Sequence, residues 1–166
     1  PGASLTARLV AGQHFSVSDG VRLGVGLLRA IATLHRQGIA HRAIGAEAVH
    51  LGLDGVVRLL DLQHARALAD PADEGGADAA SVGVPSYWAP ERFAGAEPSL
   101  ADDLYAAGVT LYHLLTRKYP YGEVSSHPSP RFGYPVPPTR WRPEIPALFD
   151  NVLLKSVALD GMYLFD

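Results

Sequence analysis

A chain of 166 residues, 48% hydrophobic and 19% charged, has the size and composition of one globular domain with its own core. Its net charge of −3 gives no electrostatic support for binding nucleic acid or an anionic membrane, and without cysteine it has neither a disulfide framework nor a thiolate metal site. No apolar run reaches the roughly 20 residues of a membrane span and no signal peptide is visible, so we expect a cytoplasmic domain without a membrane segment.

Two helices are predicted in the first part of the chain. Residues 5–11 favour a short helix. The clearest helix covers residues 18–37, where Ser18 and Asp19 can cap the start and Gly38 suits the C-terminal cap. Its expected buried face follows a helical period and consists of Val21, Val25, Leu28, Ile31 and Leu34.

A β-hairpin is predicted next. Two short apolar runs, residues 49–52 and 57–60, flank Leu53-Asp54-Gly55, and Asp-Gly between such runs is a hairpin signal. The residues 68–83 that follow are rich in Ala, Asp and Gly, which is typical of a loop.

The C-terminal half is predicted to contain a second long helix over residues 101–116, with Leu104, Gly108, Leu111, Tyr112 and Leu115 on its buried face. Residues 117–146 are rich in proline and aromatic residues and should be irregular but packed. A last helix runs from about Ile145 to Val157. One hairpin among several helices makes the fold mainly α.

Four motifs follow one another along the chain. The first is the run from Leu34 to Arg42, which continues as Ala43-Ile44-Gly45-Ala46-Glu47-Ala48. The second, Leu60-Asp61-Leu62-Gln63, comes directly after the predicted hairpin. The third ends in Ala89-Pro90-Glu91, and the fourth is Asp103-Leu104-Tyr105-Ala106-Ala107-Gly108 at the start of the second long helix.

In this order the motifs resemble H-R-D-L-K-P-E-N, D-F-G, A-P-E and D-x-W-S-x-G of protein kinases. The chain is similar to the C-terminal lobe of bacterial Ser/Thr kinases, and the resemblance covers residues 1–166 as a single domain. It implies a helical C-lobe in which the hairpin carries a catalytic loop at 41–48 and an activation-like segment at 61–91.

The N-lobe of a kinase is expected to be absent from this chain. That lobe brings a glycine-rich loop over the phosphates and a strand lysine paired to a helix glutamate. No G-x-G-x-x-G occurs here, and Lys118 and Lys155 both follow the A-P-E-like motif.

The catalytic groups that the resemblance implies are missing. Ala43 stands where the kinase Asp accepts and orients the substrate hydroxyl, Gly45 where a Lys neutralises phosphate charge, and Ala48 where an Asn holds the second Mg²⁺. We therefore expect no catalytic residue and no phosphate transfer, with ordinary loop drift or engineered substitution as the alternative explanation of the three positions.

Cofactor binding is expected to be weakened at two further positions. Asp61 matches the Mg²⁺-binding Asp of D-F-G, but it would coordinate alone, and the alternative is that it only caps the loop. His50 falls where the family packs an apolar side chain under the adenine ring, and the alternative is a ring turned aside and bonded to the backbone. No cofactor is expected for this chain, and ATP with Mg²⁺ becomes possible only with an N-lobe.

The structural part of the kinase motifs is retained. His41, Arg42 and Asp103 resemble the groups that hold the catalytic loop in shape, Leu62 can fill the apolar slot of the D-F-G Phe, and Glu47 would face a peptide substrate. Glu91 resembles the A-P-E Glu, whose buried Arg partner is replaced by Leu164. Glu91 must then find another donor such as Arg92 or be exposed.

These residues predict a pseudokinase segment that docks a partner protein or a sibling domain of the same polypeptide. The expected docking surfaces are the activation-like segment and residues 119–142, with Tyr119, Tyr121, Phe132, Tyr134 and Trp141, and internal packing of these aromatics is the alternative. Two other functions stay open when an N-lobe is joined: a nucleotide-sensing pseudokinase, or a weakly active Ser/Thr kinase that uses Glu47 as its base.

Overall fold

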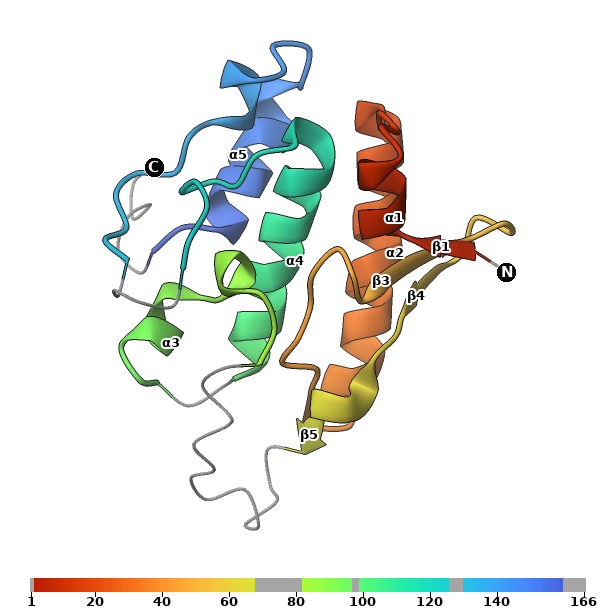
Figure 1. Cartoon of the computed structure of the whole chain (residues 1–166), viewed down its shortest axis with the longest axis vertical. Helices are drawn as coiled ribbons and strands as arrows, with labels where there is room; N and C mark the ends of the chain where they lie inside the picture. Colours follow the sequence, from red (N-terminus) through yellow and green to blue (C-terminus); the bar gives the residue numbers. More distant parts are fainter. Residues whose placement is uncertain (1, 68–81, 97–98, 126–129, 160–166) are drawn as a thin grey trace.

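The fold is a set of helices with a small sheet against one side (Figure 1). The computed structural model describes residues 2–67, 82–96, 99–125 and 130–159. Helices α2 (Val17–His35) and α4 (Leu100–Thr116) lie side by side, and α5 (Ala147–Ser156) packs against α4. The short helices are α1 (Leu5–Val10) and α3 (Pro90–Phe93).

The predicted hairpin is present and belongs to a three-stranded sheet. Strands β3 (Val49–Gly52) and β4 (Val57–Leu59) pair antiparallel, and β1 (Gly2–Ser4) adds on the other edge of β3. A second pair joins β2 (Ile39–Ala40) to β5 (Arg66–Ala67). The prediction of one hairpin was therefore incomplete, because strands of two or three residues are too short to show a period.

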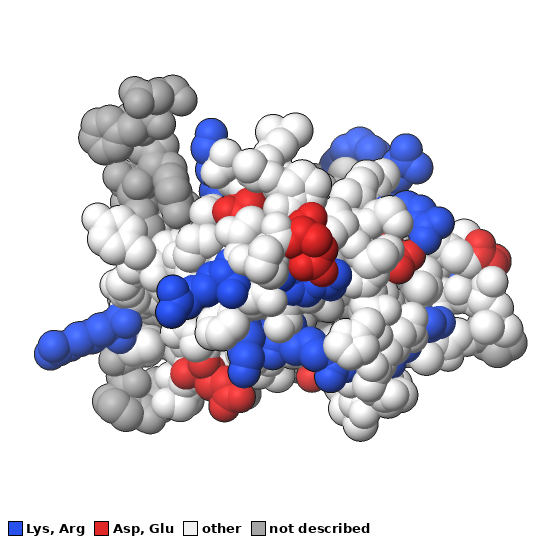
Figure 2. Space-filling view, turned by 90° about the horizontal axis from the view of Figure 1, so that it is seen from above, with Lys and Arg blue, Asp and Glu red and all other residues white. Residues whose placement is uncertain are grey.

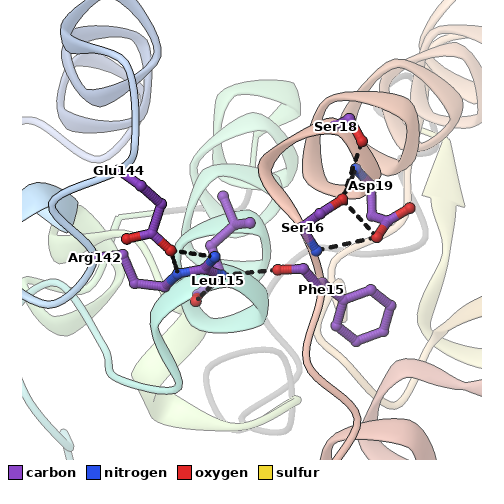
Figure 3. Close-up of polar contacts among 7 residues, drawn as sticks. All are labelled: Phe15, Ser16, Ser18, Asp19, Leu115, Arg142 and Glu144. Atoms are coloured by element: carbon purple, nitrogen blue, oxygen red, sulfur yellow. Dashed lines mark hydrogen bonds and ion pairs between the residues drawn. The ribbon is translucent and has the colours of Figure 1, made fainter.

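Helix α2 begins at a capping box that lies just before the predicted start. The Ser16 hydroxyl accepts a hydrogen bond from the backbone N–H of Asp19 at 3.1 Å, and the Asp19 carboxylate accepts one from the Ser16 N–H at 3.0 Å (Figure 3). Ser16 is thus the cap, whereas Ser18 lies inside the first turn. The helix ends at His35, before the predicted boundary at 37, and Gly38 is in the left-handed region at φ +70°.

The buried face of α2 differs from the predicted one. Leu23, Leu27 and Ile31 are buried as core residues. Of the predicted set, only Ile31 is fully buried, while Val21, Val25 and Leu28 are 45–46% exposed.

Three glycines explain why α2 buries a different face from the predicted one. A Cβ on Gly20 would lie 2.8 Å from Leu115 of α4, and one on Gly24 would lie 3.0 Å from Leu111. A Cβ on Gly26 would lie 2.7 Å from Val57 of β4. The faces that carry no side chain are therefore those that approach α4 and the hairpin most closely, and they leave the valines outside.

Helix α4 is the centre of the core and lies between α2 and α5. Every residue from Tyr105 to Tyr112 is buried, so this part of the helix is covered all round. The predicted positions Gly108, Leu111, Tyr112 and Leu115 are all buried. Leu104 is 47% exposed, which corrects the prediction that placed it on the buried face.

Two contacts tie α4 to the C-terminal part of the chain. Tyr112 is the largest side chain of the core that is fully shielded, and its hydroxyl donates a hydrogen bond to the Val136 carbonyl at 2.8 Å. Gly108 sits against α5, where an added Cβ would lie 2.3 Å from the Ser156 hydroxyl. The helix therefore has no room for a side chain where it meets α5.

The segment between α4 and α5 is irregular but tied down, as predicted. Among its described residues, 117–125 and 130–146, only Pro138–Arg140 forms a short 3₁₀ turn. Arg142 donates to the Phe15 carbonyl at 2.7 Å and to the Leu115 carbonyl at 3.2 Å, and it pairs with Glu144 (Figure 3). One guanidinium therefore joins the irregular segment to the end of α4 and to the entry of α2.

Lys and Arg side chains are spread over the face of the molecule seen in Figure 2 rather than gathered in one patch. Two arginines bind backbone carbonyls: Arg8 of α1 donates to the Leu51 carbonyl of β3 at 3.2 Å, and Arg117 donates to the carbonyls of Leu9 and Gln13 around the α1–α2 connection. These two cations serve internal contacts. Within the described residues, no helix has the length and apolar character needed to cross a membrane.

Candidate functional site

A buried polar site surrounds Asp103 in the first turn of α4. Asp103 is 1% exposed, and its carboxylate accepts hydrogen bonds from the backbone N–H groups of His41 at 2.7 Å and Arg42 at 2.9 Å. His35, at the end of α2, lies 2.9 Å from the same carboxylate through Nε2. Hydrogen bonds to an ionised acceptor are stronger than neutral ones, so this carboxylate fixes the loop that begins at His41.

The loop backbone is held in an uncommon conformation at this point. Arg42 has φ +71°, in the left-handed region that disfavours residues with a Cβ. Such a conformation costs on the order of 1–3 kcal/mol and persists only where the surroundings enforce it. The two consecutive N–H groups bound by Asp103 supply that enforcement.

His41 connects the same loop to the hairpin. Its side chain is fully buried, and Nε2 lies 3.0 Å from the carbonyl oxygen of Leu60, the residue after β4. Because a carbonyl only accepts, Nε2 carries the proton, and Nδ1 is left to accept from the Ala43 N–H at 3.4 Å. The structure therefore brings together His41, Arg42 and Asp103, as the motifs predicted, and adds His35, which the sequence did not single out.

The space beside Ala43 is almost closed. The cavity there has a volume of about 10 Å³, which is room for one water molecule at most. Gly83, Trp88 and Arg92 are among the other residues that line it. The Trp88 indole N–H donates to the Val82 carbonyl at 2.7 Å, and the Arg92 guanidinium lies 4.6 Å from the centre of the Trp88 ring.

Gly45 and Ala48 also face packed surroundings. A Cβ on Gly45 would lie 3.2 Å from both the Tyr87 ring and the Glu47 carboxylate. Ala48 is 4% exposed, and its carbonyl accepts from the Leu60 N–H at 2.8 Å. Glu47 itself is exposed. A longer side chain at either small position would have to move its neighbours.

A second polar cluster lies next to this loop. The Tyr87 hydroxyl is 2.9 Å from His113 Nδ1, and the Tyr119 ring packs against both rings, with centroids 5.6 Å and 4.4 Å away. Burial raises the pKa of Tyr87 far above its usual range and lowers the pKa of His113. Tyr87 is therefore the donor and the neutral imidazole is the acceptor. The sequence offered no signal for this pairing, because 26 residues separate the partners.

Two predicted roles are corrected at the residues after the hairpin. Asp61 adopts the left-handed conformation at φ +62° and precedes a short 3₁₀ turn, but its exposed side chain makes no capping hydrogen bond. The alternative that Asp61 caps the loop was thus wrong. Leu62 is 50% exposed and fills no apolar slot among the described residues.

His50 lies on β3 opposite Arg58 and lines an open cavity of about 480 Å³. The other lining residues include Gly52, Asp54 and Leu60. Arg58 pairs with Asp54 at 2.6 Å, and this hydrogen bond holds the pKa of Asp54 well below its usual range. No hydrogen bond of the His50 ring occurs within the described part of the chain, which contradicts the alternative that it bonds the backbone.

The remaining predicted positions lie apart from these clusters. Glu91, in α3, is exposed, which agrees with the second of its two predicted outcomes. Its expected partner position, Leu164, lies outside the described residues, as does most of the predicted loop 68–83. No group of three or more His, Asp or Glu side chains suited to a metal occurs in the part of the chain that the structure describes.

Comparison with known proteins agrees with the motifs. The family model described as protein kinase domain matches residues 1–130. The chain belongs to the protein kinase family. A probable serine/threonine-protein kinase of Streptomyces coelicolor is 32% identical over 98% of this kinase-family chain, and the serine/threonine-protein kinase PknB described as probable in Bifidobacterium longum is 32% identical over 87%.

A third relative, the serine/threonine-protein kinase PknD of Chlamydia muridarum, is 30% identical over 80% of the chain. The kinase-family chain spans only 24%, 21% and 16% of the lengths of these three relatives. It is therefore comparable with part of each relative, and its mostly helical structure with small sheets is that of a kinase domain fragment.

Proposed function

We propose that this kinase-family chain is a C-lobe that does not transfer phosphate and instead docks a partner protein. The observation that carries the proposal is Ala43. In the kinase motif H-R-D-L-x-x-x-N, the third position is the catalytic base, and the last position binds a metal. Aligned from His41 and Arg42, these two positions are Ala43 and Ala48, and the position between them, Gly45, lacks the lysine of the same motif.

The described surroundings of Ala43 support this view, because the residues known to line its cavity offer no free base. Two carboxylates line the small cavity, Asp102 and Asp103. Asp103 is engaged by His35, His41 and Arg42, and Asp102 accepts from the Ser99 hydroxyl and N–H at the start of α4. A carboxylate that already caps backbone N–H groups is held away from a substrate hydroxyl.

A phosphotransfer assay tests this half of the proposal. The intact polypeptide that carries this chain is incubated with radiolabelled ATP, Mg²⁺ and a generic basic protein substrate. We expect incorporation no higher than for a heat-denatured control. Incorporation that disappears in Glu47→Gln would establish Glu47 as the base of a weakly active kinase and overturn the proposal.

The docking half rests on the aromatic segment 119–142. Tyr119, Tyr121 and Phe132 pack on other rings, with Tyr121 and Phe132 centroids 5.2 Å apart, so part of the set serves internal packing. Tyr134 is 83% exposed and Trp141 44% exposed, and these two are the available anchors. The partner is a separate protein or another domain of the same polypeptide, in the cytoplasm.

A pull-down with the immobilised chain tests this surface. Tyr134→Ala should release bound proteins, whereas Leu148→Ala, which changes an exposed apolar side chain on α5, should not. Unchanged capture by Tyr134→Ala and by Trp141→Ala would exclude the segment as the docking surface.

A second candidate function, nucleotide sensing without transfer, is favoured by the cavity beside His50. Its volume of about 480 Å³ is in the range of small-molecule sites. Asp61 would be the Mg²⁺ ligand only if nucleotide binds. ATP at about 100 times its dissociation constant should raise stability by about 2.7 kcal/mol, or about 5–10 °C in melting temperature. A Mg²⁺-dependent rise of that size in the intact polypeptide would favour sensing over docking alone.

A further inference from the structure

The outer face of α2 is apolar and unpartnered within the described residues, and it borders a groove. The face carries Val21, Val25 and Leu28, each 45–46% exposed. A cavity of about 600 Å³ runs between this face and the hairpin tip at Val56. A second cavity of about 250 Å³ continues it toward Phe15 and Leu51.

The two cavities form one feature. Both are lined by Arg22, Gly55 and Val57, so they meet where the hairpin turn approaches α2. We name this feature the α2–hairpin groove. Its lining includes the valines Val21, Val25, Val56 and Val57, and Gly26 allows Val57 of β4 to approach the helix closely. Exposed apolar side chains that lie together beside a groove are typical of an interaction site.

Charged side chains on the groove are mostly cationic. Arg22 and Arg29 line it, and the single acidic residue among its described lining is Asp19, which pairs with Arg22. The Arg22 side chain is still 76% exposed and keeps donors to spare. Arg29 has no side-chain partner within the described residues. An occupant that places carboxylates beside these two arginines would therefore be complementary.

The spacing of the apolar residues indicates the shape of the occupant. Val21 and Val25, four residues apart, form a ridge that lines the groove along a helix of 19 residues, and Leu28 continues the same apolar stripe beyond the groove lining. Helices pack by laying such ridges into grooves of a second helix. The alternative, addition of a strand to the hairpin edge, is disfavoured because β4 has only three residues.

We infer that the α2–hairpin groove binds an amphipathic helix of a partner protein, with apolar side chains on one face and flanking carboxylates opposite Arg22 and Arg29. This inference rests on the docking function proposed above, but it assigns a different surface and the chemistry of the partner. Binding combines apolar burial against the valines with charge pairing at the rim.

The probe is a fluorescein-labelled helix of about 14 residues of Leu and Glu with Leu at i, i+3, i+4 and i+7, and its counterpart has Lys in place of Glu. Fluorescence anisotropy is measured with the full 166-residue chain. We expect the Leu/Glu probe to bind and the Leu/Lys probe to bind at least about tenfold more weakly, since one such charge pair is worth about a factor of ten.

Variants locate the site. Val25→Glu and Arg29→Glu change exposed residues, and each should weaken the Leu/Glu probe about tenfold or more. The matched controls Leu148→Glu on α5 and Arg140→Glu should leave its affinity unchanged. Equal binding of both probes, or equal effects of groove and control variants, would overturn the inference.

The same variants separate other outcomes. If the unliganded chain sediments as a dimer that Val25→Glu dissociates, a second copy covers the groove and the helix inference is wrong. If the probe binds at the groove while Tyr134→Ala and Trp141→Ala leave the pull-down unchanged, the groove stands and the aromatic segment fails as the docking surface. If the probe does not bind while the pull-down still depends on Tyr134 and Trp141, the aromatic segment stands as the docking surface and the groove inference is wrong.

Discussion

Gly26 offers a stringent test of how α2 packs on the hairpin. An added Cβ would lie 2.7 Å from a methyl group and 2.8 Å from the Cβ of Val57. Val57 is β-branched, so it has little rotamer freedom with which to move aside. The clash should cost roughly 1–3 kcal/mol, as overpacked cores do, whereas replacing a helical glycine by alanine should gain about 1 kcal/mol.

The two effects separate in a double-mutant cycle. Gly26→Ala should lower the free energy of unfolding of the natural chain by up to about 2 kcal/mol, equivalent to a melting temperature up to about 8 °C lower. In the Val57→Ala background the clash is removed, and Gly26→Ala should instead raise stability by about 1 kcal/mol.

Urea denaturation followed by circular dichroism gives the free energy of unfolding of the natural chain, the two single variants and the double variant. The expected result is that the effect of Gly26→Ala on this free energy changes sign between the two backgrounds. As a control, Gly24→Ala meets only the end of the flexible Leu111 side chain, so it should be better tolerated. A Gly26→Ala change that stabilises both backgrounds equally would refute the close contact between α2 and β4.

Three further predictions concern the polar contacts. Asp103→Asn replaces the carboxylate that accepts from two backbone N–H groups and contacts His35. The free energy of unfolding, measured by denaturant titration, should therefore fall by about 3 kcal/mol. A fall of less than about 1 kcal/mol would contradict the role of the carboxylate. Arg142→Gln loses the bonds to the Phe15 and Leu115 carbonyls and should cost about 1–3 kcal/mol, whereas the exposed Arg140→Gln should cost almost nothing. Burial lowers the pKa of His113. The negative charges of Glu47 and Glu123 act to raise this pKa, but burial is the larger effect, so the folded state prefers the neutral ring. Stability from this group is complete above about pH 6.5 and is lost as the pH falls below that value toward the folded pKa, so His113→Gln should flatten the acid side of a stability–pH curve.

The sequence was sufficient for α1, α2, α4 and α5, the hairpin and the loop at Asp103, because each leaves a local pattern or a motif, whereas the four-residue α3 was not predicted. Apolar periods place α2 and α4, and Asp54-Gly55 places the turn. The buried face of α2 was missed because a count of apolar residues gives no weight to glycine, while close packing against α4 selects it.

Other features depend on contacts between distant residues and could not be read locally. The pairing of Tyr87 with His113 and the near closure of the space beside Ala43 arise from where separate segments meet. The exposure of Leu62 has a similar origin, since burial is decided by neighbours that a motif does not name.

The glycines of α2 also bear on how the chain folds during synthesis. Three glycines in one helix lower its intrinsic stability by roughly 2.5–3 kcal/mol relative to alanine, so residues 17–35 depend on their packing partners to become helical. The partners on α4 are made about 90 residues later. Because chains emerge N-terminus first, this segment leaves the ribosome long before it can be buried, and its valines and leucines are then exposed to chaperones and to other nascent chains.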